Sequence, residues 1–152
     1  MEPRFTMSEQ APQLYRAMAA LQGQVRQSVD PVLNELVKIR ASQLNGCAFC
    51  IDMHTKDARA AGESEQRIYA LNGWRETPFF TDRERAALAL TEAVTHLGDG
   101  HVPDSVYEEA ARHFDRTDLV ALVWAIVAIN AWNRIAITSR TVPGSYKPEE
   151  AR

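Results

Sequence analysis

Helix start and stop signals punctuate the chain from end to end, and this pattern constrains the fold more than any other feature. Apolar residues recur at helical spacing, and capping residues, prolines and glycines separate the periodic segments. The alternating apolar and polar runs that mark half-buried strands are not part of the pattern. We therefore predict an all-α fold: one compact helical bundle over residues 1–152, with a core of about 30–139 and a polar tail of about 140–152.

Seven helices are predicted, each from its own boundary signals. Asp30 followed by Pro31 is typical of an N-cap and first helical residue, and Gly46, Gly62 and Gly73 are expected to end helices. Capping-box spacing, a Ser or Thr followed three residues later by Glu, recurs at Thr81/Glu84 and Ser105/Glu108. The predicted ranges are about 11–27, 30–46, 51–61, 64–72, 81–95, 105–114 and 118–139.

Composition excludes several classes of partner. Seventeen Lys and Arg against 20 Asp and Glu give a formal charge of −3. Because no block of like charge stands out, we expect no nucleic-acid partner and no membrane partner. The segment 119–129 is the most apolar, but its eleven residues are short of the roughly 20 that span a bilayer, so a buried helix is expected. The N-terminus lacks the apolar core of a signal peptide, and we expect a cytoplasmic protein.

The stretch "NGCAFCIDMHTKD", residues 45–57, contains both cysteines of the chain. Helical spacing places Cys47, Cys50 and His54 on one face. A structural disulfide is not expected in the cytoplasm, so the pair indicates redox or metal chemistry. If Cys50 lies in the first turn of a helix, backbone N–H groups and the helix dipole favour its thiolate. Imidazole titrates near neutral pH, so His54 is a candidate proton carrier.

Glu35 is the fourth candidate site residue. It falls at the edge of the apolar stripe of the second predicted helix, where a half-buried carboxylate with a raised pKa is expected. A short turn at Asn45 and Gly46 would fold the second helix back toward the third, which carries His54.

Glu35, eleven intervening residues, then Cys47-x-x-Cys50-x-x-x-His54 resembles the AhpD-like alkylhydroperoxidase family, also called the carboxymuconolactone decarboxylase family. The likeness covers about residues 35–95 and implies an AhpD-like helical bundle that assembles as a homo-oligomer, a trimer or hexamer. It also implies that Cys50 attacks peroxide, that Cys47 resolves the product, and that Glu35 and His54 form a proton relay. The partners would be a peroxide or disulfide substrate and an external thiol reductant, with no bound cofactor or metal.

One departure from the family pattern concerns the residue between the cysteines. The best-described peroxidases of the family have a second histidine there, whereas this chain has Phe49. The proton relay is therefore shorter by one histidine. This affects how efficiently the protein would reduce peroxide, whereas the dithiol chemistry of the two cysteines does not depend on it.

Other interpretations of the cysteines stay open at the level of sequence. Cys47, Cys50 and His54 have the donor types for zinc, with Glu35 or water as fourth ligand. Alternatively, both cysteines are small buried residues. Attachment of c-type haem is excluded, because position 51 is isoleucine where CxxCH requires histidine. Rival functions are a decarboxylase of a muconolactone-like acid, which needs no cysteine pair, and a non-enzymatic redox sensor.

Polar residues inside apolar helices need partners. Arg40 is expected to pair with a carboxylate or to lie at a subunit contact, and Asn130, Asn133 and Arg134 are expected to bind carbonyls or a neighbouring subunit. Together with its aromatic residues, the apolar last helix suggests more apolar surface than one subunit covers, in line with a homo-oligomer.

Overall fold

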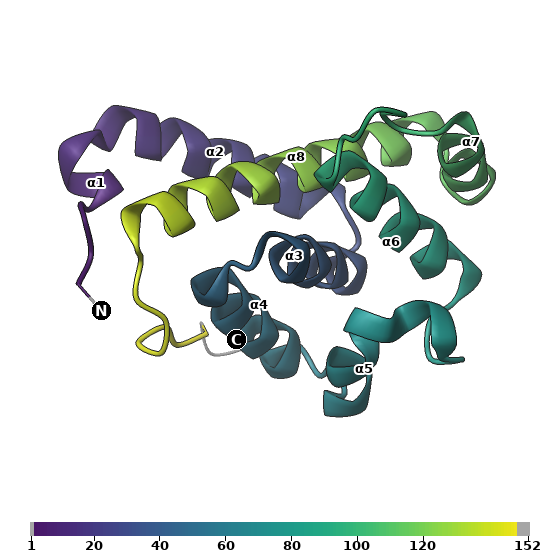
Figure 1. Cartoon of the computed structure of the whole chain (residues 1–152), viewed down its shortest axis with the longest axis horizontal. Coiled ribbons are helices and arrows are strands. Elements are labelled where there is room, and N and C mark those ends of the chain that lie inside the picture. Colours follow the sequence, from purple (N-terminus) through teal and green to yellow (C-terminus); the bar gives the residue numbers. More distant parts are fainter. Residues whose placement is uncertain (1, 149–152) are drawn as a thin grey trace.

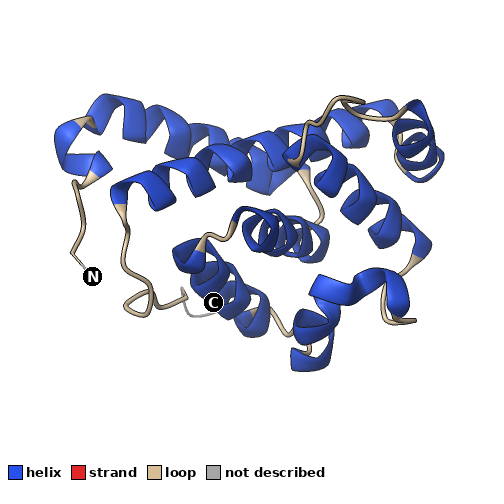
Figure 2. Cartoon of the chain, viewed as in Figure 1, coloured by secondary structure: helices blue, strands red, loops and turns tan. Residues whose placement is uncertain are grey.

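A computed structural model describes residues 2–148, and helices make up its architecture (Figures 1 and 2). Eight α-helices and one 3-10 helix follow one another, and no strand occurs among the described residues, so the predicted all-α class is confirmed. The elements are α1 (Met7–Gln10), α2 (Pro12–Ser28), α3 (Pro31–Asn45), α4 (Ala48–Ala60), α5 (Glu65–Ala70), η1 (Leu71–Glu76), α6 (Asp82–Thr95), α7 (Asp104–His113) and α8 (Arg116–Ser139).

Helix α3 lies at the centre of the bundle (Figure 1). It packs against α4, α6 and α8, and it contributes to two clusters of buried apolar side chains. Val37 belongs to the cluster that α3 shares with α8, and Leu36 and Ile39 belong to the one it shares with α6 and η1. A helix enclosed in this way has little freedom to shift, so it is a rigid support for Glu35.

Several predicted helix boundaries are confirmed and others are wrong: the helix expected from Ile51 already begins at Ala48, as α4, with Cys47 as its cap. Both hydrogen bonds of the capping box at Thr81 and Glu84 are present. At the second predicted capping box, α7 instead begins at Asp104 with Pro103 as its cap, so Ser105 already lies inside the first turn. Gly73 marks a break, as predicted, because its φ and ψ are not helical, but the chain resumes a helical turn beyond it within η1. The reason lies in the next residue: Trp74 is buried, and its ring N–H donates to Glu92 at 2.8 Å.

Helix α8 crosses α2 and packs against α2, α3 and α6 (Figure 1). At 24 residues, with a mean hydropathy of 1.7 over its most apolar window, it is long and apolar enough to cross a membrane, a test that core helices of soluble proteins also meet. In this fold 44% of that window is buried inside the protein. Val120, Trp124 and Val127 stay exposed on its outer face. The expected trimer or hexamer would cover such a face; it stays a prediction that a mass measurement in solution can test.

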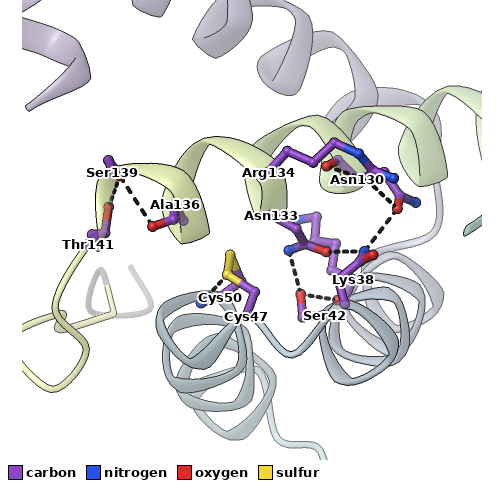
Figure 3. The surroundings of a disulfide bond; sticks show 11 residues. Lys38, Ser42, Cys47, Cys50, Asn130, Asn133, Arg134, Ala136, Ser139 and Thr141 are labelled. Atoms are coloured by element: carbon purple, nitrogen blue, oxygen red, sulfur yellow. Dashed lines mark hydrogen bonds between the residues drawn. A yellow bond between two sulfur atoms is a disulfide. The ribbon is translucent and has the colours of Figure 1, made fainter. Parts of the chain in front are cut away.

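Buried polar side chains join α8 to α3, as Figure 3 shows in part. The Asn133 amide donates to the Ser42 hydroxyl at 3.0 Å, and the Asn45 amide donates to the side-chain oxygens of Asn130 and Asn133, both at 2.9 Å. Arg134 donates to the carbonyl and side-chain oxygen of Asn130. The polar residues of the last helix thus find partners within the chain, both side chains of α3 and α6 and carbonyls of α8 itself.

Arg40 pairs with a carboxylate, as the sequence predicts. Its guanidinium lies 2.8 Å from Glu92 of α6 and also donates to Asn72 of η1. Because Glu92 accepts from Trp74 as well, one carboxylate ties α3, α6 and η1 together.

The C-terminal segment is more ordered than a polar tail suggests. The Gly144 N–H donates to the Asp52 carboxylate at 3.0 Å, and the Tyr146 hydroxyl donates to Asp57 at 2.7 Å. Lys56 donates to the carbonyls of both segment residues. This segment therefore lies along α4, while residues 149–152 of the predicted tail fall outside the described residues.

Candidate active site

A tight corner between α3 and α4 creates the site. Gly46 ends α3 with φ of +69°, a left-handed conformation that glycine adopts at little cost. The Cys47 N–H then donates to the Ser42 carbonyl, and Cys47 becomes the N-cap of α4. Because the chain reverses within these residues, α4 lies against α3, as the Asn45–Gly46 turn predicts.

Cys47 and Cys50 are joined by a disulfide across the first turn of α4, with their Cα atoms 5.3 Å apart. The two residues are 1% and 2% exposed, and they pack against Ala136 of α8 and the partly buried Phe49 (Figure 3). The neighbouring side chains must therefore move before a peroxide or a reductant reaches either sulfur.

The helix N-terminus acts on Cys47 rather than on Cys50. The Cys50 N–H donates to the Cys47 sulfur at 3.3 Å, which is the bond that an N-cap side chain makes with the third helical residue. The expectation that backbone N–H groups point at the Cys50 sulfur is thus wrong, because that sulfur belongs to the donor residue. In the reduced protein, this arrangement favours the thiolate of Cys47.

Glu35 and His54 form the predicted contact. One carboxylate oxygen of Glu35 lies 2.9 Å from Nδ1 of His54, and the side chains are 17% and 8% exposed. Among the described residues, no hydrogen bond runs from His54 to either sulfur in this disulfide form. His54 follows Cys50 by one helical turn, so both project from the same face of α4.

The pKa of Glu35 is lowered from its usual 4.5, and the expectation of a raised value is wrong. Burial acts most strongly and raises the pKa, but the hydrogen bond with His54 and the positive charge of Lys38 together outweigh it. Glu35 is therefore ionised at neutral pH.

Lys38 is the site residue that the sequence analysis missed. Its ammonium lies 2.8 Å from the second carboxylate oxygen of Glu35, and its side chain is 7% exposed. Spacing i, i+3 from Glu35 and a position among the apolar residues of α3 are the signals that would have found it. Asp57 completes the surroundings, with a carboxylate oxygen 4.0 Å from Nδ1 of His54.

Glu35, His54 and Asp57 are close enough to consider as cation ligands. Each offers a ligand atom, and these atoms lie within 4.8 Å of one another. The Lys38 ammonium, however, already neutralises Glu35 and would repel a cation beside it. In the disulfide form the two sulfurs are not thiolates, so they are not zinc ligands either. We therefore assign no cation to this cluster.

Comparison with known proteins gives consistent relationships. A sequence profile described as "Carboxymuconolactone decarboxylase family" matches residues 12–93. Uncharacterized protein YdfG of Bacillus subtilis is 46% identical over 138 residues, which cover 90% of this chain and 94% of that protein. A crystal structure from Agrobacterium tumefaciens, of a protein of unknown function proposed to be the antioxidant defence protein AhpD, has a TM-score of 0.92 and 39% identity, covering 95% of this chain and all of that one.

A more distant structure shares the fold alone. The debrominase Bmp8 without ligand has a TM-score of 0.79 at 19% identity, over 88% of this chain and 73% of that one. The profile match over more than half of the chain, together with the identity to YdfG, establishes the relationship: this protein belongs to the carboxymuconolactone decarboxylase family and has its AhpD-like helical fold.

Proposed function

We propose that the protein is a thiol-dependent peroxidase or disulfide oxidoreductase that cycles Cys47 and Cys50 between dithiol and disulfide. The observation that carries the proposal is the Cys47–Cys50 pair itself, bridged at the start of the helix that also holds His54 against the ionised Glu35. Supporting it, the family and the peroxidase-related names among its structural neighbours fit redox chemistry of this kind.

The proposed cycle uses two substrates, a peroxide that oxidises the dithiol and a thiol that reduces the disulfide. The Cys50 thiolate attacks one peroxide oxygen, the O–O bond breaks, and Cys50 becomes a sulfenic acid while the other oxygen leaves as an alcohol or water. The Cys47 sulfur then attacks the Cys50 sulfur, so that the disulfide forms and a water molecule leaves. An external thiol reductant supplies two electrons and two protons, which restores the dithiol and releases the oxidised reductant.

Each cysteine has a separate requirement in this cycle. Cys47 must be a thiolate when it attacks the sulfenic acid, and its position as N-cap of α4 favours that form. Cys50 needs a proton acceptor when it ionises and a proton donor for the leaving oxygen. His54 lies one helical turn away, and its Nδ1 is held by Glu35, which leaves the other ring nitrogen for the proton exchange.

The first test separates an enzyme from its rivals. Reduced protein is mixed with one equivalent of peroxide, and its thiols are counted and its mass measured under denaturing conditions. We expect both thiols to disappear without reducible dimers, because the two sulfurs are close enough to bridge within one chain. With excess peroxide and a dithiol reductant, we expect continuous turnover.

Each other result supports a named alternative. One stoichiometric oxidation without turnover is the behaviour of a redox sensor. Two thiols that survive peroxide would contradict the proposal and favour the decarboxylase branch of the family, which acts without a cysteine pair. A dimer linked by a disulfide as the main product would contradict the intramolecular cycle.

Phe49 is expected to limit peroxide turnover. It lies between the cysteines and is partly buried against them, where better-known peroxidases of the family have a histidine. Phe49→His should raise turnover by something like tenfold, within the range that one positioned acid or base contributes. Steady-state peroxide consumption at saturating reductant measures this. A folded Phe49→His protein with no faster turnover would show that proton transfer at this position does not limit the rate.

A further inference from the structure

Lys38 is the only buried lysine or arginine among the described residues. A lysine side chain is rarely buried in full unless it is paired, because removing an ammonium group from water is costly. Its backbone is fixed as well, since its carbonyl accepts from the Ser42 hydroxyl, which in turn accepts from Asn133 of α8. The fold therefore holds the Lys38 ammonium at a defined point inside the site.

The Glu35 carboxylate bridges that charge and the histidine. One oxygen faces the Lys38 ammonium at 2.8 Å, and the other faces Nδ1 of His54 at 2.9 Å. With both oxygens engaged, the carboxylate has one orientation, and this orientation directs it at the imidazole. Lys38 thus acts on His54 only through Glu35.

We propose that Lys38 is a positioning residue of the relay: its buried ammonium binds one oxygen of Glu35 and so holds the other oxygen turned toward His54. This inference rests on the proposed redox function for its catalytic meaning, but the effect on Glu35 is independent of that function. Neither the family profile nor the motif that identified Cys47, Cys50, His54 and Glu35 assigns a role to this lysine.

The charge of Glu35 depends on the groups that face it. Burial alone raises the pKa of a carboxyl group, and a protonated Glu35 would no longer stabilise a protonated His54. Lys38 from α3 and His54 from α4 oppose this effect. Asp57 is a second carboxylate near His54, at 4.0 Å, and its other oxygen accepts from Tyr146 of the C-terminal segment. Without Lys38, two carboxylates would surround one imidazole, and no other lysine or arginine of residues 2–148 pairs with Glu35.

The test replaces the charge while keeping the length of the side chain. Lys38→Met removes the ammonium, Lys38→Arg retains a positive charge, and Arg112→Met is the matched control. Arg112 pairs with Glu109 at the same i, i+3 spacing, but on the exposed surface of α7. Lys38→Gln, which keeps a hydrogen-bond donor without the charge, replaces Lys38→Met if that variant does not fold.

The direct measurement is the ¹³C NMR titration of the Glu35 carboxyl carbon in each protein. We expect the pKa of Glu35 to rise in Lys38→Met and to stay lowered in Lys38→Arg and in Arg112→Met. As pH falls, Glu35 is then protonated at a higher pH in Lys38→Met than in the wild type. The fall in the rate of peroxide oxidation at acidic pH should therefore also begin at a higher pH. At about pH 6 we expect a roughly tenfold slower oxidation, with a smaller deficit at higher pH.

The outcomes distinguish this role from a purely structural one. A Glu35 titration in folded Lys38→Met that matches the wild type would overturn the inference, as would a rate loss that is equal at every pH. If wild-type protein does not react with peroxide, the proposed function fails, yet the Glu35 titration still decides the role of Lys38. If the fall in rate at acidic pH is shifted in Lys38→Met but unchanged in Lys38→Arg, the positive charge of Lys38 is identified as the cause.

Discussion

Cys50→Ser is expected to abolish peroxide consumption, whereas Cys47→Ser should still react once and then stop. A serine hydroxyl is not a nucleophile toward peroxide, so the loss in Cys50→Ser should reach the detection limit, on the order of 10³-fold or more. In Cys47→Ser, Cys50 would be oxidised to a sulfenic acid that no second thiol resolves. Trapping with a dimedone-type reagent and mass spectrometry should locate that sulfenic acid on Cys50.

We do not expect the loss of activity in these variants to come from misfolding. Cys47 is the N-cap of α4, and serine is among the preferred N-cap residues, so Cys47→Ser keeps the cap. Thermal unfolding of both variants, in reductant and beside reduced wild-type protein, provides the control.

The opposite division of labour has a clear signature. The N–H of residue 50 donates to the Cys47 sulfur, so a backbone donor is already in place to stabilise a Cys47 thiolate. If Cys47 attacks peroxide, the sulfenic acid will be trapped on Cys47 in Cys50→Ser, and Cys47→Ser will be inert. That result would reverse the assignment that the family resemblance implies, and it would make the helix N-cap the source of reactivity.

The sequence predicts much of the fold because helix boundaries are local. Asp30 accepts from the N–H of Leu33, and Gly46 adopts the left-handed conformation, as their residue types predict. Both signals depend on a few neighbouring residues, so the sequence alone is enough. Distant contacts decide where local signals are not enough: beyond the break at Gly73 the chain resumes a helical turn, and Trp74 of that turn binds Glu92, which lies 18 residues further on.

The members of the candidate site were predictable except for Lys38, whereas its electrostatics were not. Glu35 and His54 meet because a glycine turn joins two helices whose faces the periodicity predicts. The direction of the Glu35 pKa was missed because the hydrogen bond with His54 and the charge of Lys38, taken together, outweigh the effect of burial. Burial alone would have raised that pKa, and the position of Glu35 at the edge of an apolar stripe indicates burial but not the neighbouring charges.

The largest effect outside the cysteines is expected for Glu35→Gln, which removes the charge and keeps the size of the side chain. Lowering a thiol pKa by about 2 units from about 8.5 increases the thiolate fraction at pH 7 roughly 25-fold, but reduced nucleophilicity takes back a factor of roughly 8. A positioned acid or base contributes about 10² to 10⁴. A relay that depends on Glu35 should therefore lose about 10²-fold in Glu35→Gln.

Glu109→Gln supplies the matched control, because Glu109 also contacts a histidine, His113, but at the exposed surface of α7. It should leave peroxide oxidation unchanged. Stability gives a second readout: the lowered pKa of Glu35 contributes to the free energy of unfolding above the usual carboxyl value of 4.5, and this contribution disappears as pH falls through the folded pKa. Glu35→Gln should lack that part of the pH dependence, measured by denaturant unfolding from about pH 3 to 7.

Single-turnover oxidation of the reduced proteins by peroxide decides between the two sources of rate. A loss of about 10²-fold in Glu35→Gln, with Cys50 alkylation by iodoacetamide only a few-fold slower, would show that the carboxylate serves proton transfer and not thiolate formation. Equal losses in both reactions would show instead that Glu35 acts by setting the ionisation of Cys50. A wild-type rate in folded Glu35→Gln would remove the carboxylate from the chemistry and leave the Glu35–His54 contact as a structural link between α3 and α4.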